Sequence, residues 1–157
     1  MWILRLVLTS TSNVSLPVIH QTTGEETVAQ NDAIADFLKC VESGKVRGDV
    51  FSDGVVLDAT VPNWRFRAVG MDAVRSELAE WYADPGHFES LSRRALGEGS
   101  GTELVEFFLT WQEDGVLHGC HQAHVICVED GRITSDTAFC GGRWPAPLLE
   151  RMGPVNA

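Results

Sequence analysis

The second half of the chain is dominated by four segments in which apolar and polar side chains alternate, joined by short turns that contain glycine. This period of two is typical of half-buried β-strands, and such short turns join antiparallel neighbours. The segments lie near residues 87–97, 102–112, 116–128 and 132–141, and the turns lie at 99–101, 113–115 and 129–131. The sequence therefore predicts an antiparallel meander.

The first half predicts helices around a broken pair of strands. A stripe at helical spacing (Ile34, Phe37, Leu38 and Val41) predicts a helix over residues 27–43. A short helix is expected over 45–51, strands over 55–61 and 64–68 on either side of Pro62, and a longer helix over 72–82. This order predicts an α+β fold with helices packed on one face of a curved antiparallel sheet.

Length and charge limit the class of protein. With 157 residues the chain has room for one domain of common size. Its formal net charge of −10 opposes binding to nucleic acid or to an anionic membrane, which both require clusters of Lys and Arg. The apolar stretch at residues 2–8 is short and is broken by Arg5, so neither a signal peptide nor a membrane span is expected. We expect a flexible extension over 1–26, one domain over 27–145 and a tail over 146–157.

The cysteines and glycines exclude several cofactors. Cys40, Cys120, Cys127 and Cys140 form no C-x-x-C pair, which argues against a zinc knuckle or a thioredoxin-like motif. Free thiols in the cytoplasm are expected instead. No glycine-rich phosphate loop is present, so no organic cofactor is expected.

Three short stretches, in this order and spacing, suggest a family. They read Val-Val-Leu-Asp-Ala-Thr-Val-Pro at 55–62, Gly-Met-Asp-Ala-Val at 70–74 and Asp-Gly-Arg-Ile at 130–133. With them the chain resembles the nuclear transport factor 2-like (NTF2-like) superfamily over residues 27–145, and within it the SnoaL-like group, which includes polyketide cyclases. The resemblance implies a cone-shaped sheet with helices on its concave face, a deep pocket between them, and dimers through the convex face. Because such folds carry many activities, the site must decide the function.

The resemblance also implies which strand positions face the pocket. Successive strand side chains alternate between the two faces, and the even positions of 116–128 are expected to point inward. The odd positions of the neighbouring strand 102–112 would face the pocket as well. The expected inward residues are His118, Cys120, Gln122, His124 and Ile126 on one strand and Val105, Phe107, Leu109 and Trp111 on the other.

The last hairpin determines the predicted chemistry. A three-residue loop over 129–131, with Gly131 in the left-handed conformation and a β-bulge, pairs Val128 with Arg132 and sets His124 directly opposite Asp136. A two-residue loop would instead move Asp136 to the other face. A His–Asp pair in an apolar pocket is suited to acid–base catalysis, and its alternative role is a buried structural pair that fixes the strand register.

Comparison with better-known groups of the superfamily narrows the range of activities to expect. Ketosteroid-isomerase-like enzymes are similar in order of elements, but their Tyr donor corresponds to Phe37 and their base Asp to Asn63. Limonene-epoxide-hydrolase-like enzymes use an Asp–Arg–Asp set, where this chain has Val105, Phe107 and Ala138. SnoaL-like cyclases use a His and an Asp, which His124 and Asp136 could supply.

Two other interpretations concern the segment 118–124. His118, Cys120 and His124 are metal-ligand types on one face, but His118 and His124 lie roughly 20 Å apart on a flat strand, so no metal is expected. Cys120 beside His118 would be a nucleophile only with a lowered pKa, and inert burial is the simpler interpretation.

The sequence thus predicts a SnoaL-like enzyme that acts by acid–base catalysis, as a cyclase, isomerase or hydrolase, on a small, apolar, oxygenated molecule. The alternative is a non-catalytic module of the same fold that binds a small ligand or dimerises. His124 and Asp136 are the predicted catalytic residues. The expected substrate-binding residues are Phe37, Asn63, Trp64, Trp81, Phe107, Trp111, Cys120 and Gln122. A homodimer is expected through an apolar convex set, which comprises Leu104, Phe108, Leu117, Val125 and Phe139.

Overall fold

The computed structural model describes residues 32–153, so the expected extension over 1–26 and the start of the first helix lie outside the described residues. One seven-stranded sheet forms the centre of this part of the chain. Its strands are β1 (Phe51–Val61), β2 (Trp64–Val69), β3 (Gly86–Ala95), β4 (Thr102–Glu113), β5 (Val116–Glu129), β6 (Arg132–Cys140) and β7 (Trp144–Pro145). The helices are α1 (Ala33–Ser43), α2 (Met71–Trp81) and α3 (Ala146–Met152), with a 3₁₀ turn at Gly48–Val50.

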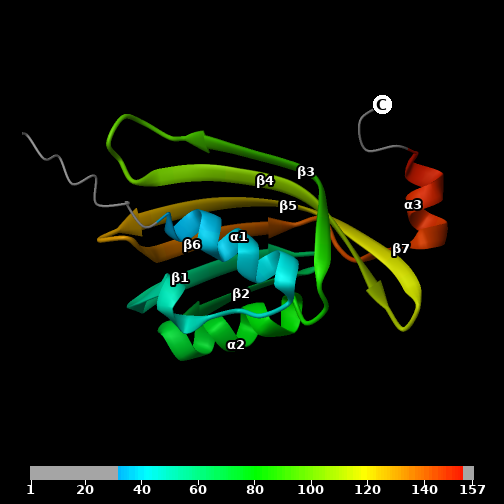
Figure 1. Ribbon diagram of the computed structural model, residues 1–157, viewed down its shortest axis with the longest axis horizontal. Coiled ribbons are helices and arrows are strands. Elements are labelled where there is room, and N and C mark those ends of the chain that lie inside the picture. The colour runs from blue at the N-terminus through cyan, green and yellow to red at the C-terminus, as the bar shows by residue number, and fades with distance from the viewer. Residues whose placement is uncertain (1–31, 154–157) are drawn as a thin grey trace, which may run out of the picture.

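The sheet confirms the predicted curved α+β architecture, with one difference in strand direction. Its order is β2-β1-β6-β5-β4-β3, with β7 added beside β5 (Figure 1). β1 and β6 run parallel, whereas the other neighbours are antiparallel, so the expectation of a wholly antiparallel sheet is wrong at this pair. Each hairpin can be inferred from its turn, but β1 and β6 are far apart in sequence and no local signal reports their pairing.

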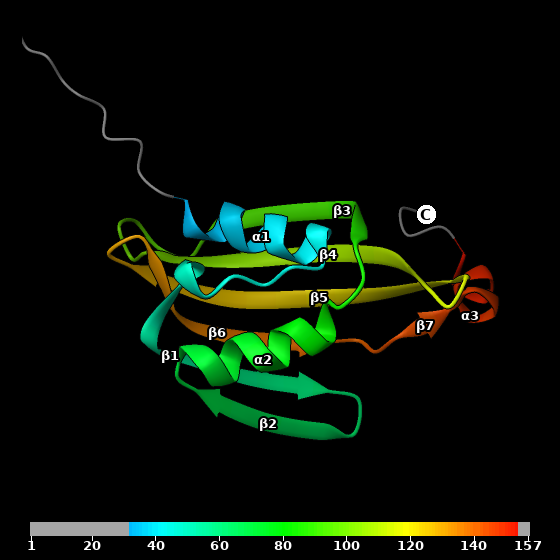
Figure 2. The same ribbon diagram turned by 60° about the horizontal axis from the view of Figure 1, so that its bottom comes forward.

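Helix α1 contacts β3, β5 and β6 and lies across the concave face of the sheet (Figure 2). Asp32 caps its first turn, since the side chain accepts a hydrogen bond from the backbone N–H of Ala35 at 3.0 Å. Gly44 ends it in the left-handed conformation, with φ of 66°. The predicted stripe of apolar residues on this helix is buried, which is what ties it to the sheet.

Helix α2 packs beside β1 and β2, and its final turn leads to Tyr82. Val74, Leu78 and Tyr82 are spaced by four residues, so they share one face, and all three are buried. The helix expected over 45–51 is only the 3₁₀ turn at 48–50, and β1 begins at Phe51 instead of Val55. Burial of large apolar side chains such as those of Val74 and Leu78 stabilises the fold by about 1.5–3 kcal/mol each.

The segment expected to be a tail includes helix α3, which lies with β7 at one end of the molecule (Figure 1). Trp144 lies over Phe108, with ring centroids 6.1 Å apart. A Cβ at Gly119 would lie 3.2 Å from Leu149 of α3 and 3.0 Å from Phe108, so glycine is what lets the helix sit close to β5. Part of the convex face is therefore covered by the chain itself. Among the described residues, no helix is both long and apolar enough to cross a membrane.

Candidate active site

The turn between β5 and β6 differs from the predicted three-residue loop. Asp130 and Gly131 form a two-residue connection with φ of 49° and 71°, and Glu129 pairs with Arg132. Positive φ at both positions is the signature of a type I′ turn, which matches the twist of the flanking strands. The predicted pairing of Val128 with Arg132 is therefore wrong, as is the direct pairing of His124 with Asp136.

A β-bulge two residues after the turn returns Asp136 to the concave face, from which the two-residue turn alone would have removed it. Val128 pairs with Ile133, but Cys127 pairs with Ser135, which leaves Thr134 as an extra residue in β6. Beyond the bulge Asp136 lies opposite Ile126, and His124 lies opposite Ala138. His124 and Asp136 consequently share the concave face as diagonal neighbours.

The two side chains make a bidentate contact. His124 Nδ1 lies 3.0 Å from both carboxylate oxygens of Asp136. An ionised carboxylate only accepts hydrogen bonds, so Nδ1 carries the proton and donates it. This contact fixes the orientation of the imidazole ring, and with it the position of Nε2.

Both members of the pair are sealed from solvent. His124 is 0% exposed and Asp136 is 2% exposed. The Phe107 ring stacks on the imidazole at 5.3 Å between centroids, and the Phe37 ring meets it edge-on at 5.8 Å. Phe37 and Phe107, both expected to contact substrate, thus enclose His124 on the core side.

The second ring nitrogen of the imidazole, Nε2, faces the polar side chains of Gln122 and Tyr82. His124 Nε2 lies 3.0 Å from Gln122 Oε1 and 3.5 Å from Tyr82 Oη. The Tyr82 hydroxyl donates to the same Gln122 oxygen at 2.5 Å. With the amide oxygen on this side, Nε2 also faces an acceptor, so both ring nitrogens can donate and the surroundings suit an imidazolium ion paired with the Asp136 carboxylate.

Tyr82 is the hydroxyl at the cavity end of this chain of contacts. Burial raises its pKa well above the ordinary value, and the neighbouring Cys120, Asp136 and Cys140 raise it further, while the Gln122 hydrogen bond acts in the opposite direction. Tyr82 therefore remains a neutral phenol near pH 7 and acts as a hydrogen-bond donor.

Tyr82 and Gln122 border a cavity of about 470 Å³, which we name the cone cavity. It lies between the C-terminal end of α2 and the adjoining ends of β1, β4, β5 and β6. Its apolar wall includes Val61, Trp81, Leu109 and Trp111. Its polar and thiol groups are Glu80, Tyr82, Cys120, Gln122, Cys140 and Arg143. This mixture of a mostly apolar wall and a few polar groups is typical of sites for small molecules.

Arg143 sits at the edge of this cavity and is held there by two contacts. Its guanidinium lies 5.2 Å from the centroid of the Trp111 ring, and it pairs with Glu113. The His118 ring also stacks on Trp111, with 5.7 Å between the ring centroids. A cation and an indole thus lie together beside the cavity.

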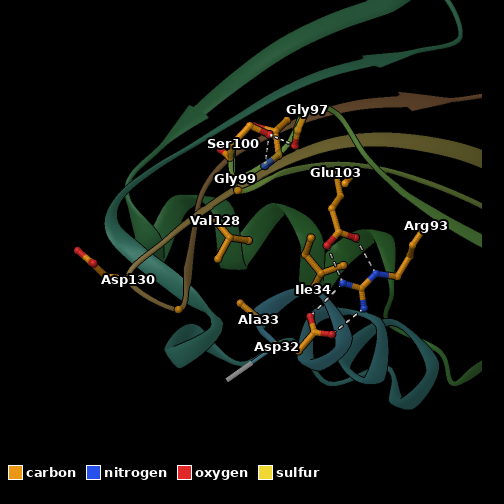
Figure 3. Close-up of a pocket in the computed structure, with 14 residues that line it drawn as sticks. Asp32, Ala33, Ile34, Arg93, Gly97, Gly99, Ser100, Glu103, Val128 and Asp130 are labelled. Carbon is orange, nitrogen blue, oxygen red and sulfur yellow. Dashed lines mark hydrogen bonds and ion pairs between the residues drawn. The ribbon is translucent and has the colours of Figure 1, made fainter. Parts of the chain in front are cut away.

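A larger hollow of about 660 Å³ lies at the opposite end of the sheet, near the β3–β4 and β5–β6 turns (Figure 3). Its main cation, Arg93, already binds Asp32 and Glu103 through hydrogen bonds of 2.8–3.1 Å. The charges there are paired with one another, and the His124 network does not border it. We therefore take the cone cavity as the candidate site.

The structure brings together only part of the expected binding set. Trp81, Trp111, Cys120 and Gln122 line the cone cavity. Asn63 and Trp64 do not, because Val61 pairs directly with Trp64 and Asn63 lies in the exposed turn beyond Pro62, which itself borders the cavity. Asn63 has φ of 64°, and Trp64 is 67% exposed.

Sequence reasoning missed several groups on the cavity wall, among them Tyr82, Cys140 and Arg143. Tyr82 had a usable signal, since it continues the apolar face of α2 at a spacing of four residues. Cys140 and Arg143 had none, because their positions depend on how the chain leaves β6 through Gly141 and Gly142. In the described part of the chain, no group of three or more His, Cys, Asp or Glu side chains is arranged to hold a metal ion.

No protein-family model matches the chain, and no curated protein matches it. Solved structures do. An NTF2-like protein from Anabaena variabilis has 15% identity and a TM-score of 0.61, and the match covers 73% of this chain and 92% of that chain. A candidate isomerase from Bacillus subtilis has 16% identity and a TM-score of 0.58, over 71% of this chain and 86% of that chain.

These two matches confirm the predicted NTF2-like fold. A candidate SnoaL-like polyketide cyclase from Mesorhizobium loti also matches, with 14% identity and a lower TM-score of 0.47, over 68% of this chain and 94% of that chain. At such identities the likeness concerns the fold, and the activity has to be argued from the site itself.

Proposed function

We propose that this protein is an enzyme that binds a small, largely apolar, oxygenated molecule in the cone cavity and transfers a proton on it. The reaction belongs to the isomerase, cyclase or hydrolase class, as in SnoaL-like enzymes. The observation that carries the proposal is the hydrogen-bonded chain that starts at Asp136, passes through His124, and ends at Gln122 and Tyr82 on the cavity wall. The assignment agrees in class with the candidate isomerase of the same fold.

Tyr82 is the group that contacts substrate. Its neutral hydroxyl can turn from Gln122 to a carbonyl or epoxide oxygen and stabilise the negative charge that develops there. The buried phenol ring holds the Tyr82 oxygen in place, so only the hydroxyl proton has to turn, and the low-dielectric wall strengthens its interaction with a developing negative charge.

His124 and Asp136 act through Tyr82. As the phenol proton moves toward the substrate oxygen, the Tyr82 oxygen can take a hydrogen bond from the imidazolium Nε2, which lies 3.5 Å away. The Asp136 carboxylate holds the imidazole in place throughout. We therefore treat Tyr82 as the proposed catalytic residue and His124, Asp136 and Gln122 as positioning residues behind it.

The wall of the cavity supports the proposed substrate class. A volume of about 470 Å³ falls in the range of roughly 300–1,000 Å³ that small-molecule sites occupy. Indole and aliphatic side chains suit a carbon framework, and the few polar groups suit one or two oxygen atoms. We infer cyclic or polyketide-like ketones and epoxides as the compounds to test.

The test is an activity screen of these compounds with the wild type and two hydroxyl-deletion variants. Tyr82→Phe is expected to lower kcat by about 10²-fold, as the loss of one oxyanion donor does in other enzymes. Ser135→Ala removes a hydroxyl from the opposite face of β6 and should leave the rate unchanged. Equal rates for Tyr82→Phe and wild type would remove Tyr82 from the mechanism.

A second candidate is the non-catalytic module that binds a ligand or dimerises. It is favoured by the complete burial of His124 and by the absence, in the described residues, of any buried side-chain nitrogen or oxygen without a hydrogen-bond partner. A satisfied network can serve only to fix the strands. Under this alternative, Tyr82→Phe would weaken ligand binding, but no compound in the screen would be converted.

We retain two accompanying proposals. One is a homodimer through the convex face, where Phe139 is 50% exposed and Leu117 is 40% exposed, although Trp144 and α3 cover Phe108. The other is a cytoplasmic location, which the free state of all four cysteines supports.

A further inference from the structure

The cone cavity is bordered by two thiols that the proposed proton transfer does not use. Cys120 projects from β5, and Cys140 stands at the end of β6. The Gln122 side-chain amide donates to both sulfur atoms, at 3.3 Å to Cys120 and 3.6 Å to Cys140. One amide therefore ties the two thiols to the wall of the cavity.

The backbone after Cys140 supplies a second donor to its sulfur. The Gly142 N–H points at Cys140 Sγ with a nitrogen–sulfur distance of 3.4 Å. Gly142 has φ of 114°, a conformation that other residues rarely adopt, and a Cβ there would lie 3.1 Å from Pro62. The glycine is thus required for the turn that aims this N–H at the sulfur.

The donors around Cys140 favour its ionised form. A hydrogen bond from Cys120 is the largest effect that lowers the pKa of Cys140; Gly142, Gln122 and His124 lower it further, and burial opposes them. The same interaction and burial raise the pKa of Cys120, which therefore keeps its proton. The titratable and charged groups that face this pair are Tyr82 after α2, Glu80 on α2, His124 on β5 with Asp136 behind it, and Arg143 after β6.

The other two cysteines lack this environment. Cys40 is 3% exposed within the core, and Cys127 Sγ contacts Thr102 Oγ1 at 3.4 Å without bordering the cone cavity. Cys140 is partly exposed and borders both the cone cavity and a hollow on the convex side. Geometry therefore distinguishes Cys140 as the accessible sulfur surrounded by donors.

We propose that Cys140 is a nucleophile that forms a thioether with an apolar α,β-unsaturated carbonyl compound bound in the cone cavity. The thiolate sulfur attacks the β-carbon, the carbon–carbon π bond breaks, and its electron pair moves onto the carbonyl oxygen as an enolate. The enolate takes a proton from water at the α-carbon, so the sum of thiol and enone equals the adduct. No oxidant, metal or leaving group takes part.

The cavity fits this class of electrophile. Trp81 and Trp111 provide a flat apolar wall for a conjugated ring, and the Tyr82 hydroxyl and the Arg143 guanidinium are donors available to the carbonyl oxygen. Formation of the sulfur–carbon bond does not require the Asp136–His124 chain, so the proposal can succeed or fail independently of the acid–base function.

The experiment incubates the reduced protein at pH 7 with 2-cyclohexen-1-one and, as a matched control, with cyclohexanone, which lacks the reactive double bond. Trypsin cleavage after Arg132 and Arg143 releases Cys140 as the sole cysteine of the peptide 133–143. Cys120 and Cys127 fall together in the peptide 95–132, and Cys40 lies in the peptide 40–45. Peptide mapping by mass spectrometry therefore identifies the modified cysteine in the wild-type protein.

We expect one cyclohexenone adduct per chain on the peptide 133–143, formed at least about tenfold faster than on free cysteine, because a low-pKa thiol is ionised at neutral pH. Cys140→Ser should abolish the adduct, and Cys127→Ser should retain it. Modification mainly of peptide 95–132 or 40–45, a rate no faster than that of free cysteine, or no adduct at all would overturn the proposal. The rate of adduct formation by the Tyr82→Phe variant separates this reaction from the proton transfer, since that variant must still form the adduct.

Discussion

His124 and Asp136 meet across β5 and β6 through a bidentate contact at 3.0 Å, although neither is the other's cross-strand partner. The extra residue Thr134 makes this possible, because it offsets the change of face that the two-residue turn at Asp130 and Gly131 would impose. The position of the buried carboxylate thus depends on a bulge in β6.

Deletion of Thr134 tests whether it is the extra residue. Removal of Thr134 lets Ser135 follow Ile133 directly, so β6 needs no bulge and Asp136 stays opposite Ile126 on the concave face. Because the contact with His124 is then kept, we expect the free energy of unfolding to fall by no more than about 1 kcal/mol, measured by urea denaturation. Deletion of Ser100, in the exposed β3–β4 turn, is the control and should have a similarly small effect. A fall of about 3 kcal/mol or more, the cost of leaving one member of a buried pair without its partner, would contradict the assignment of Thr134 as the extra residue.

The His124–Asp136 pair predicts a recovery of stability in a double variant. Asp136→Asn leaves the imidazolium uncompensated and should lower the free energy of unfolding by about 3 kcal/mol or more. The double variant His124→Leu, Asp136→Val replaces both charges by apolar groups and should recover most of that loss. If the single variant costs under about 1 kcal/mol, or if the double variant is no more stable than the single one, the pair is not an ion pair in the folded protein.

Asp32 predicts a pH-dependent contribution to stability. The hydrogen bond with Arg93 is the main cause that lowers the pKa of Asp32, with burial opposing it. A lowered pKa in the folded state stabilises the protein above the unfolded value of about 3.9, and this stabilisation is lost as the pH falls through the folded pKa. Asp32→Asn, which keeps a residue suited to the N-cap, should therefore cost up to about 1 kcal/mol at pH 7, because the pair is partly exposed, and progressively less as the pH falls through the lowered pKa of Asp32.

The control for this experiment is Asp130→Asn in an exposed turn, where asparagine tolerates the positive φ. Thermal melts of both variants and the wild type, recorded from pH 2 to pH 7, measure the difference. A deficit in Asp32→Asn that is the same at pH 2 and pH 7 would show that the charge on Asp32 has no part in it.

Phe139 tests the proposed dimer. A lysine at this half-exposed position would place a charge in the proposed interface, so Phe139→Lys should shift the protein toward the monomer in sedimentation velocity. Leu91→Lys is the matched control, because Leu91 is 45% exposed but pairs with the inward-facing Phe107 on the other side of the sheet. Wild-type protein that sediments as a monomer at all concentrations, or that loses its dimer equally in both variants, would contradict the interface.

Local patterns predicted the strands, the stripe on α1 and the inward face of β5, since these depend on side-chain alternation and spacing within one element. They failed where the result depends on partners distant in sequence. The parallel β1–β6 pair has no local signal, and the turn at 129–131 is compatible with two registers that only packing decides. His124 and Asp136 were brought to one face by a bulge at Thr134, further along β6 than the bulge predicted at the Gly131 loop.

The cavity wall illustrates the same limit. Gln122 and Trp111 follow from strand alternation, whereas Asn63 was expected inward from a family resemblance at a turn whose length and direction the sequence leaves open. Tyr82 could have been found, because Val74, Leu78 and Tyr82 share a helical face. Cys140 could not, since its donors arise from the conformation of Gly142.

The most direct test of the site is the crystal structure of the protein with a bound cyclic ketone, determined for the wild type and for Tyr82→Phe. We predict that the ketone occupies the cone cavity with its oxygen about 2.7 Å from the Tyr82 hydroxyl, and that His124 Nε2 turns toward the freed Tyr82 oxygen or stays on Gln122 without leaving Asp136. In Tyr82→Phe the ketone should lose this position. A ketone whose oxygen lies on another group while Tyr82 remains bonded to Gln122, or one that binds identically in both proteins, would contradict the account.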